Sequence, residues 1–536
     1  MQTDFVRILL WGALFAMAFM LWNAWHLDYA EKAPTQLRQN ANISFPSSAS
    51  QPASNLPTVS STPIRVQTDV LNVAIDPIGG NLIEAELLKY PQEKDSQKPI
   101  HLLNPDPARL YLAQSSLVTP SGTQPFIYQS PQSAYQLNSN QDTLLVKLMA
   151  KGSDKIWVEK IFNFKKGSYL IGVDYRIHNQ SPQVFTGYLD ERLVRKKVAP
   201  PSKGLFHINP YIGAAYSTPA TPFEKLGFED MAKADLNQEV KSGWIAMLQL
   251  YFLSAWIPDK NQSFHFYSQE LGNDVYAIGM QSPHFTLTPN GQYSAHSDLY
   301  IGPAISDVLN SIAPHLGLAV NYGWLWFISE WLFWFLKQIH SVIGNWGWAI
   351  VILTALIKLV FYHLSAKSYR SMAKMRQLQP RLEALKKRHG DDKQKLMQET
   401  MELYKKERVN PMGGCLPILV QIPVFIALYW VLLESVELYQ APFILWIRDL
   451  SSPDPYYILP LLMGITMFIQ QKLSPPPPDP TQEKLMLLMP VIFTALFLYF
   501  PAGLVLYWVV NNALSILQQW YITKHYHPAK KSFKSK

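Results

Sequence analysis

The sequence contains only one cysteine, Cys415, among 536 residues. A single cysteine excludes an intramolecular disulfide, so the compartment has to be inferred from topology instead. The sequence also contains no phosphate-binding glycine loop, no GxSxG and no HExxH, and its histidines are scattered without metal-ligand spacing. We therefore expect no catalytic residue, no bound metal, no cofactor and no enzymatic activity.

Hydrophobic residues make up 48% of the chain, and the long apolar runs lie at its start and in its last third. The final run is nearly twice as long as one spanning helix and is broken by "FPAG" at 500–503. Counting it as two helices gives six membrane spans, with a core of five spans in the C-terminal part. The apolar runs are Ile8–Trp25, Gly347–Ser365, Leu416–Glu434, Tyr457–Leu473 and Leu485–Tyr521.

Basic residues decide the predicted orientation. The segment 366–414 is strongly basic, with helix formers on both sides of "HGDD", and the C-terminal tail 524–536 is basic as well. The positive-inside rule places both in the cytoplasm. We expect a helical hairpin over 366–414, a five-span core over 346–523, and both termini in the cytoplasm.

The segments before the core differ sharply in composition. Residues 1–30 suit an uncleaved membrane anchor, and 31–63 are rich in Ser and Pro, which indicates a flexible linker. Residues 64–320 show short stretches of period-two alternation between turn residues, which predicts a two-sheet β-sandwich. Residues 321–345 are crowded with tryptophan, which favours an amphipathic helix in the membrane interface.

Lys358 stands inside the second predicted span, about 10 Å from its cytoplasmic end at 1.5 Å per residue. Thr354 and Tyr362 lie four residues to either side, on the same helical face. Gln421 is at a similar depth in the next span, about 9 Å from its end. Two interpretations remain open: a water-accessible cavity around Lys358, or a lysine that snorkels to the headgroups. For Asn512 and Gln518 in the last span, contacts between helices are the better interpretation.

Several motifs then allow a family comparison. The segments "GWLWFIS", "SMAKMR", "GDDKQK", "NPMGGC", "DPYYILP", "MPVIFT" and "GLVLYW" resemble the YidC/Oxa family of membrane-protein insertases, as do "GAAYSTP" and "GWIAMLQ" in the predicted sandwich. The resemblance covers nearly the whole chain except the linker and the extreme tail. It implies a protein of the bacterial inner membrane, in which residues 64–320 form a periplasmic β-sandwich domain and the last five spans form a hydrophilic groove open to the cytoplasm and to lipid.

The resemblance also implies roles for individual residues. Lys358 occupies the groove position where the family usually carries an arginine, so the charge is kept and the bidentate fork is lost. Thr354 and Gln421 match groove-lining positions. Trp508 matches a position that is often tyrosine, where substrate is thought to pass. With Tyr362, these residues form our predicted substrate groove.

The function that we predict is insertion and folding of newly made inner-membrane proteins, without nucleotide hydrolysis. The expected partners are nascent membrane proteins, the ribosome through the basic hairpin and the C-terminal tail, the Sec translocon, and anionic lipids. Two alternatives are a small-solute transporter and an anchored periplasmic carbohydrate-binding protein. The sequence shows no internal repeat and no acidic residue at mid-depth in the last five spans, which disfavours the transporter.

Overall fold

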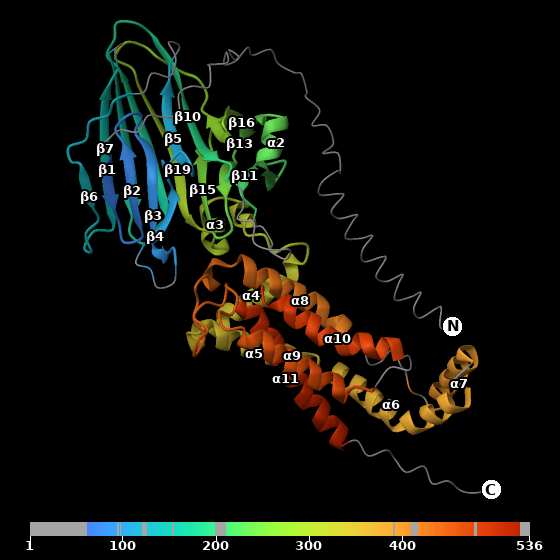
Figure 1. Cartoon of the computed structure of the whole chain (residues 1–536). Coiled ribbons are helices and arrows are strands. Elements are labelled where there is room, and N and C mark those ends of the chain that lie inside the picture. The colour runs from blue at the N-terminus through green and yellow to red at the C-terminus, as the bar shows by residue number, and fades with distance from the viewer. Residues whose placement is uncertain are drawn as a thin grey trace.

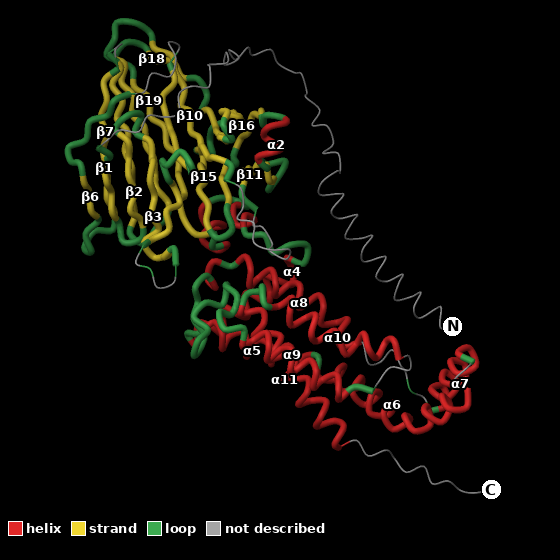
Figure 2. The backbone as a smooth tube through the Cα atoms, viewed as in Figure 1, coloured by secondary structure: helices red, strands yellow, loops and turns green. Residues whose placement is uncertain are grey.

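The fold is described from a computed structural model. It describes residues 62–525 except 94–95, 97, 120–125, 153–154, 199–210, 390–391, 408, 410–415 and 476–479. The predicted anchor, nearly all of the predicted linker, and residues 526–536 of the tail lie outside the described residues. The described chain has two parts, a β-sandwich and a helical bundle beneath it (Figures 1 and 2).

Two sheets form the sandwich, and nearly all of their neighbouring strands are antiparallel. The smaller sheet has eight described strands, in the spatial order β12 (Glu224–Leu226), β11 (Gly213–Ser217), β14 (Trp244–Leu248), β15 (Phe252–Pro258), β19 (Gln292–Pro303), β9 (Leu170–Asn179), β8 (Ile156–Lys165) and β7 (Thr143–Lys151).

The larger sheet has eleven described strands. Its main path runs through β13 (Asn237–Lys241), β16 (Ser263–Gly272), β17 (Val275–Gln281), β10 (Phe185–Lys196), β5 (Tyr111–Val118), β3 (Asn81–Pro91), β2 (Leu71–Asp76), β1 (Ile64–Gln67) and β6 (Ala134–Gln136). β18 (Phe285–Leu287) pairs with β10, and β4 (Pro99–Leu103) pairs with β3. The β6 strand lies parallel to β1.

The period-two pattern explains how the sandwich closes. In β8, Val158, Phe162 and Phe164 point inward and are almost fully buried. Lys160 shares this face and is fully buried too, so one amino group lies inside the sandwich. Its Nζ donates to the carbonyls of Gly80 at 2.6 Å and Ser115 at 2.9 Å. These bonds satisfy polar hydrogens that would otherwise make burial costly.

Twelve described helices carry the rest of the regular structure. Those within or just after the sandwich are α2 (Phe228–Lys233), α3 (Ser306–Ile312) and the 3₁₀ turn η1 (Leu316–Ala319). The others are α4 (Trp326–Ile343), α5 (Trp346–Val360), α6 (Tyr362–His389), α7 (Lys393–Lys406), α8 (Leu416–Glu434), the 3₁₀ turn η3 (Val436–Leu438), α9 (Ile458–Leu473), α10 (Pro480–Phe497) and α11 (Ala502–His525).

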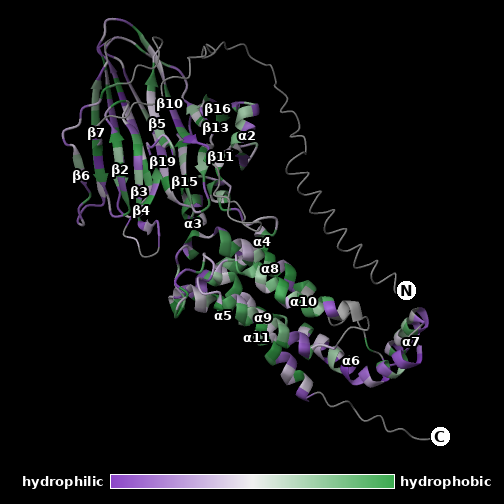
Figure 3. Cartoon of the chain, in the orientation of Figure 1, coloured by the Kyte–Doolittle hydropathy of each residue, from purple (hydrophilic) through white to green (hydrophobic). Residues whose placement is uncertain are grey.

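Most helices of the bundle are hydrophobic, whereas the end formed by α6 and α7 is largely hydrophilic (Figure 3). Within the described residues, no single helix combines the length and apolar composition that a membrane crossing requires. Together, α5 and α6 meet both criteria, with a bend of 68° between them. Shorter apolar helices cover Leu419–Glu434, Ile458–Leu473 and Lys484–Phe497. The number of spans therefore stays a prediction.

The structure tests two of the sequence predictions in the bundle. The apolar run that begins at Leu485 forms two helices, α10 and α11, and the break between them lies near the predicted position. The run from Gly347 to Ser365 is not one continuous helix, because α5 ends at Val360 and α6 begins at Tyr362 in a new direction. The helix α4 carries its tryptophans outward and packs on α5 and α8.

The sandwich and the bundle share a hydrophobic core. One cluster of buried residues includes Tyr300 in the smaller sheet, Leu432 in α8 and Leu438 in η3. Polar contacts add to it: Tyr439 Oη and Gln440 Nε2 both donate to the Pro91 carbonyl, at 3.2 and 3.1 Å. The bundle is thus fixed to the sandwich by both apolar and polar contacts.

Candidate functional site

The candidate site is built around Lys358 near the C-terminal end of α5. Asn345 caps the start of this helix, because its side chain accepts a hydrogen bond from Trp348 N at 3.1 Å. The side chain of Lys358 is only partly exposed, and its Nζ donates to Ser515 Oγ at 2.7 Å and to Gln421 Oε1 at 3.4 Å. The lysine therefore joins α5 to α8 and α11.

The polar contacts continue beyond the lysine. Gln421 Nε2 donates to Tyr507 Oη at 3.2 Å, and Ser515 Oγ donates to the Asn511 carbonyl at 2.7 Å. Among the described residues, no carboxylate lies in ion-pair contact with Lys358. The hydrogen-bond acceptors of this lysine are neutral, so no opposite charge in direct contact balances it.

A narrow crevice opens beside this network. It encloses about 20 Å³ of space, room for about one water molecule. Its walls come from the C-terminal end of α5, the start of α6, the start of α8, and α11. They comprise Ile357, Lys358, Phe361, Leu364, Ser365, Pro417, Val420, Gln421 and Asn511. Apart from Lys358, the polar residues among them are a serine and two amides.

The structure brings only two of the five predicted groove residues, Lys358 and Gln421, into this crevice. Thr354 is 1% exposed, and its hydroxyl donates to the carbonyl of Ile350 in its own helix at 2.6 Å. Tyr362 lies beyond the bend, is 39% exposed, and does not line the crevice. The i, i+4 spacing alone did not anticipate these different environments.

Trp508 packs away from the crevice, among aromatic side chains of α8 and α10. Its ring meets Phe425 edge to face at 4.7 Å between centroids and is stacked at 6.4 Å on Phe493. The indole nitrogen is buried and has no hydrogen-bond partner among the described residues. This tryptophan therefore contributes packing rather than a polar contact to the bundle.

The sequence shows the polar residues of the last predicted span, Asn511, Asn512, Ser515 and Gln518, which are expected to face the bundle or a wet cavity. It does not single out Ser515 as the partner of Lys358, and the role of Tyr507 was missed. Tyr507 lies in an apolar stretch and gave no signal. The interpretation of Asn512 as a contact between helices is confirmed, since its Nδ2 donates to Thr466 Oγ1 in α9 at 3.2 Å. Gln518 similarly donates to the Tyr362 carbonyl at 3.2 Å.

The basic segment after α5 forms two helices, α6 and α7, that lie against each other. Met375 and Leu378 in α6 pack with Tyr404 in α7. Arg381 Nη1 also donates to Glu407 Oε1 at 2.9 Å. In Figure 1, α7 lies at the end of the bundle away from the sandwich. Within the described residues, no group of three or more His, Cys, Asp or Glu is placed to hold a metal ion.

Comparison with known proteins extends over nearly the whole chain. The family model "60Kd inner membrane protein" matches residues 338–530, and that of the YidC periplasmic domain matches residues 63–335. A membrane protein insertase YidC of Legionella pneumophila is 50% identical, with 98% of this chain and 99% of the relative covered. The protein of the same name in Coxiella burnetii is 44% identical, with 99% of each covered.

One solved structure, an active YidC insertase with its first transmembrane domain resolved, aligns with a TM-score of 0.40 at 20% identity, covering 87% of this chain and 93% of that one. Fold and family models together define the class: an inner-membrane protein whose helical core carries a large β-rich periplasmic domain. The sequence identities of 50% and 44%, over nearly the full length of both chains, then determine the family. The chain belongs to the YidC family, whose relatives named above are membrane protein insertases.

Proposed function

We propose that this chain inserts newly made membrane proteins by receiving a short polar flank of the substrate at the crevice around Lys358. The observation that carries the proposal is a cation held only by neutral groups, between three helices. An acidic or polar flank finds a positive charge there, while the apolar part of the substrate moves into lipid. The partition of that apolar part supplies the driving force.

Short helices support the same mechanism. The helix α9 has 16 residues, which at 1.5 Å per residue makes it about 24 Å long, and the apolar helix Lys484–Phe497 is shorter still. The hydrocarbon core of a typical bilayer is about 30 Å thick. A bilayer that thins around these helices shortens the distance that a polar flank has to cross, and so lowers the barrier.

The crevice in this structure has room for about one water molecule, so it must widen to admit a peptide. The contacts that close it are hydrogen bonds from Lys358 to Gln421 and Ser515. A substrate carboxylate can replace either neutral acceptor and form an ion pair with the lysine, in which both partners of the hydrogen bond are charged. The substrate itself thereby offsets the cost of opening the site.

The proposed topology has six spans, with both termini and the α6–α7 hairpin in the cytoplasm. The hairpin and the tail are then the parts that meet the ribosome, and the basic residues nearby attract anionic lipids. The Sec translocon is a further proposed partner. These assignments are supported by the basic residues in 366–414 and 524–536 and by membership of the family.

Crosslinking during translation tests the path. A photoreactive residue replaces Gln421 in the crevice or, as the matched control, Leu419 in the same helix, which is 57% exposed. A single-span protein with an acidic flank is then synthesised beside each variant. We expect crosslinks from position 421 that fade when synthesis is complete, and mainly lipid adducts from position 419. Equal crosslinking from both positions would reject the crevice as the path.

A further inference from the structure

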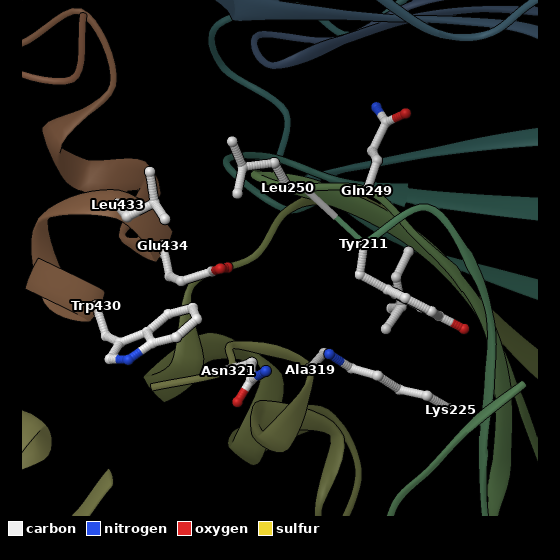
Figure 4. Close-up of a pocket in the computed structure, with 10 residues that line it drawn as sticks. Tyr211, Lys225, Gln249, Leu250, Ala319, Asn321, Trp430, Leu433 and Glu434 are labelled. Carbon is white, nitrogen blue, oxygen red and sulfur yellow. The ribbon is translucent and has the colours of Figure 1, made fainter. Parts of the chain in front are cut away.

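A second pocket lies between the sandwich and the bundle, far along α8 from the Lys358 crevice. It encloses about 200 Å³ and is lined by Tyr211 and Lys225 from the sandwich, Asn321 from the connecting segment, and Trp430 and Glu434 from the end of α8. Figure 4 shows Lys225 and Glu434 extending into it from opposite walls. The two domains therefore contribute opposite charges to one cavity.

Neither charge has a direct partner of opposite sign. Within the part of the chain that the structure describes, no ion pair or hydrogen bond is formed by Lys225 Nζ or by the carboxylate of Glu434. The ammonium group of Lys225 lies over the ring of Tyr211, 4.7 Å from its centroid. Burial lowers the pKa of Lys225, an effect that the carboxylate of Glu434 partly offsets. Partial burial removes water from both charges, and no ion pair between them compensates for this loss of hydration. A ligand that carries one positive and one negative charge would supply the missing partners.

The pocket lies close to a group of exposed tryptophans that marks the membrane boundary. The neighbouring segment and α4 carry exposed tryptophans, with Trp324 at 60%, Trp326 at 57% and Trp331 at 67% exposed. Tryptophan favours the boundary between membrane and water. Since the sandwich is the periplasmic domain, this boundary is the outer surface of the inner membrane. The pocket therefore opens at the level of the lipid headgroups.

We propose that this pocket binds the zwitterionic headgroup of a phospholipid, with the phosphate against Lys225 and the ammonium against Glu434. Asn321 adds a donor for a phosphate oxygen, because its Oδ1 is already engaged with Gly323 N at 3.0 Å and its amide nitrogen remains. Leu250 and Leu433 offer an apolar wall to the glycerol and the first methylenes.

Pocket size and charge placement favour a lipid over a peptide. A cavity of about 200 Å³ admits one small group that carries both charges, whereas a peptide would need two side chains and their backbone. A headgroup bound there joins the sandwich to α8 from the membrane side. This inference goes beyond insertion, and it rests on the proposed topology only in placing the end of α8 at the outer surface.

Lipid binding can be measured without any substrate protein, so failure here is distinct from failure of the insertion mechanism. The full-length protein is purified, stripped of lipid in detergent, and titrated with phosphatidylethanolamine or phosphatidylglycerol under native mass spectrometry. The variants are Lys225→Met, Glu434→Gln and Lys225→Arg. Lys233→Met is the control, because this lysine is exposed on α2 and lies outside the pocket.

We expect Lys225→Met to weaken binding of phosphatidylethanolamine at least tenfold, while Lys225→Arg and the control keep it. Glu434→Gln should abolish the preference for phosphatidylethanolamine over phosphatidylglycerol. Equal binding by all variants would overturn the proposal. So would binding of soluble glycerophosphoethanolamine without binding of the lipid. Should Lys225→Met fail to fold, judged by its thermal unfolding, the contrast between Lys225→Arg and Glu434→Gln decides.

Discussion

The hydroxyl of Ser515 accepts a hydrogen bond from Lys358 Nζ at 2.7 Å, although 157 residues separate the two in sequence. The same hydroxyl donates to the Asn511 carbonyl, so the oxygen that faces the lysine is fixed in position. Lys358 is thus held by a neutral group at a definite place between α5 and α11. The charge at this position is the property that the proposed mechanism uses.

Reversing that charge should reverse the substrate preference. We expect Lys358→Glu to slow insertion of a substrate with an acidic flank at least tenfold, because a tenfold change in rate needs only about 1.4 kcal/mol, and two charges about 4 Å apart contribute about 4 kcal/mol at an effective dielectric constant of about 20. Lys358→Arg should keep normal insertion. Protease protection of the translocated flank measures the effect.

A substrate whose flank is basic instead of acidic provides the control for this experiment. Lys358→Glu should insert this substrate at least as well as the unchanged protein does. If both substrates lose insertion equally in Lys358→Glu, the variant has damaged the bundle, and the charge has no role of its own.

Trp508 should be replaceable by phenylalanine at little cost. Its indole nitrogen is buried without a hydrogen-bond partner among the described residues, and an unsatisfied buried donor costs about 1–3 kcal/mol. Phenylalanine keeps most of the contact with Phe425 and Phe497. We expect Trp508→Phe to leave the melting temperature unchanged or higher. Trp508→Ala should lower it, because an aromatic cavity costs about 3–5 kcal/mol of unfolding free energy. A large loss in both variants would show that the indole nitrogen matters.

Gly347 should tolerate no side chain, because a Cβ at this position would lie 2.0 Å from Cδ2 of Phe443. Overpacking of this kind costs about 1–3 kcal/mol, so Gly347→Ala should lower the melting temperature of the full chain. Gly344→Ala is the matched comparison. It meets no atom within 4 Å, but it must adopt a φ of +72°, at a cost of about 1 kcal/mol. Gly344→Ala should therefore be the milder variant, and the reverse order would contradict the steric argument.

Lys160 and Glu191 give the sandwich a predictable response to pH. Burial lowers the pKa of Lys160 to about 7 and raises the pKa of Glu191 to about 7. Between pH 4.5 and 7 the folded state binds more protons at Glu191 than the unfolded state, so this contribution to stability falls as pH rises. Between pH 7 and 10.5 the folded state binds fewer protons at Lys160, so that contribution grows with pH. The two effects together give a minimum near pH 7.

The double variant Lys160→Met/Glu191→Gln removes both titrations. Denaturant unfolding of the full chain at pH 5, 7 and 9 gives the difference in unfolding free energy between the unchanged protein and this variant. Relative to the double variant, the unchanged protein should have its lowest unfolding free energy at pH 7. A difference that does not change with pH would mean that neither group shifts its proton affinity on folding.

Some of these relationships could be predicted from sequence. The rise per residue of a helix placed Lys358 and Gln421 at the same depth, and the structure brings them within hydrogen-bond distance. In β8, side chains alternate between the two faces of the strand, so Lys160 lies on the same face as Val158 and Phe162. Its burial could therefore be predicted from the alternation. Depth along an element and the face of a strand both follow from local geometry.

Other features depend on information that a local pattern lacks. Thr354 lies on the lysine's side of an ideal helix, but a threonine hydroxyl can bond the carbonyl four residues earlier, and here it donates to Ile350. The bend at Phe361 could not be predicted from a proline, because none lies at this position. The pairing of β10 with β5 joins strands with four others between them in sequence, and alternation says nothing about partners.

The clasp of Tyr439 and Gln440 on the Pro91 carbonyl also constrains the order of events during synthesis. Pro91 leaves the ribosome nearly 350 residues before its partners do. In the proposed topology, this contact can form only after the segment following α8 has been made and moved across the membrane. Because contacts so remote in sequence form late, we expect the sandwich to dock on the bundle only at that stage of synthesis.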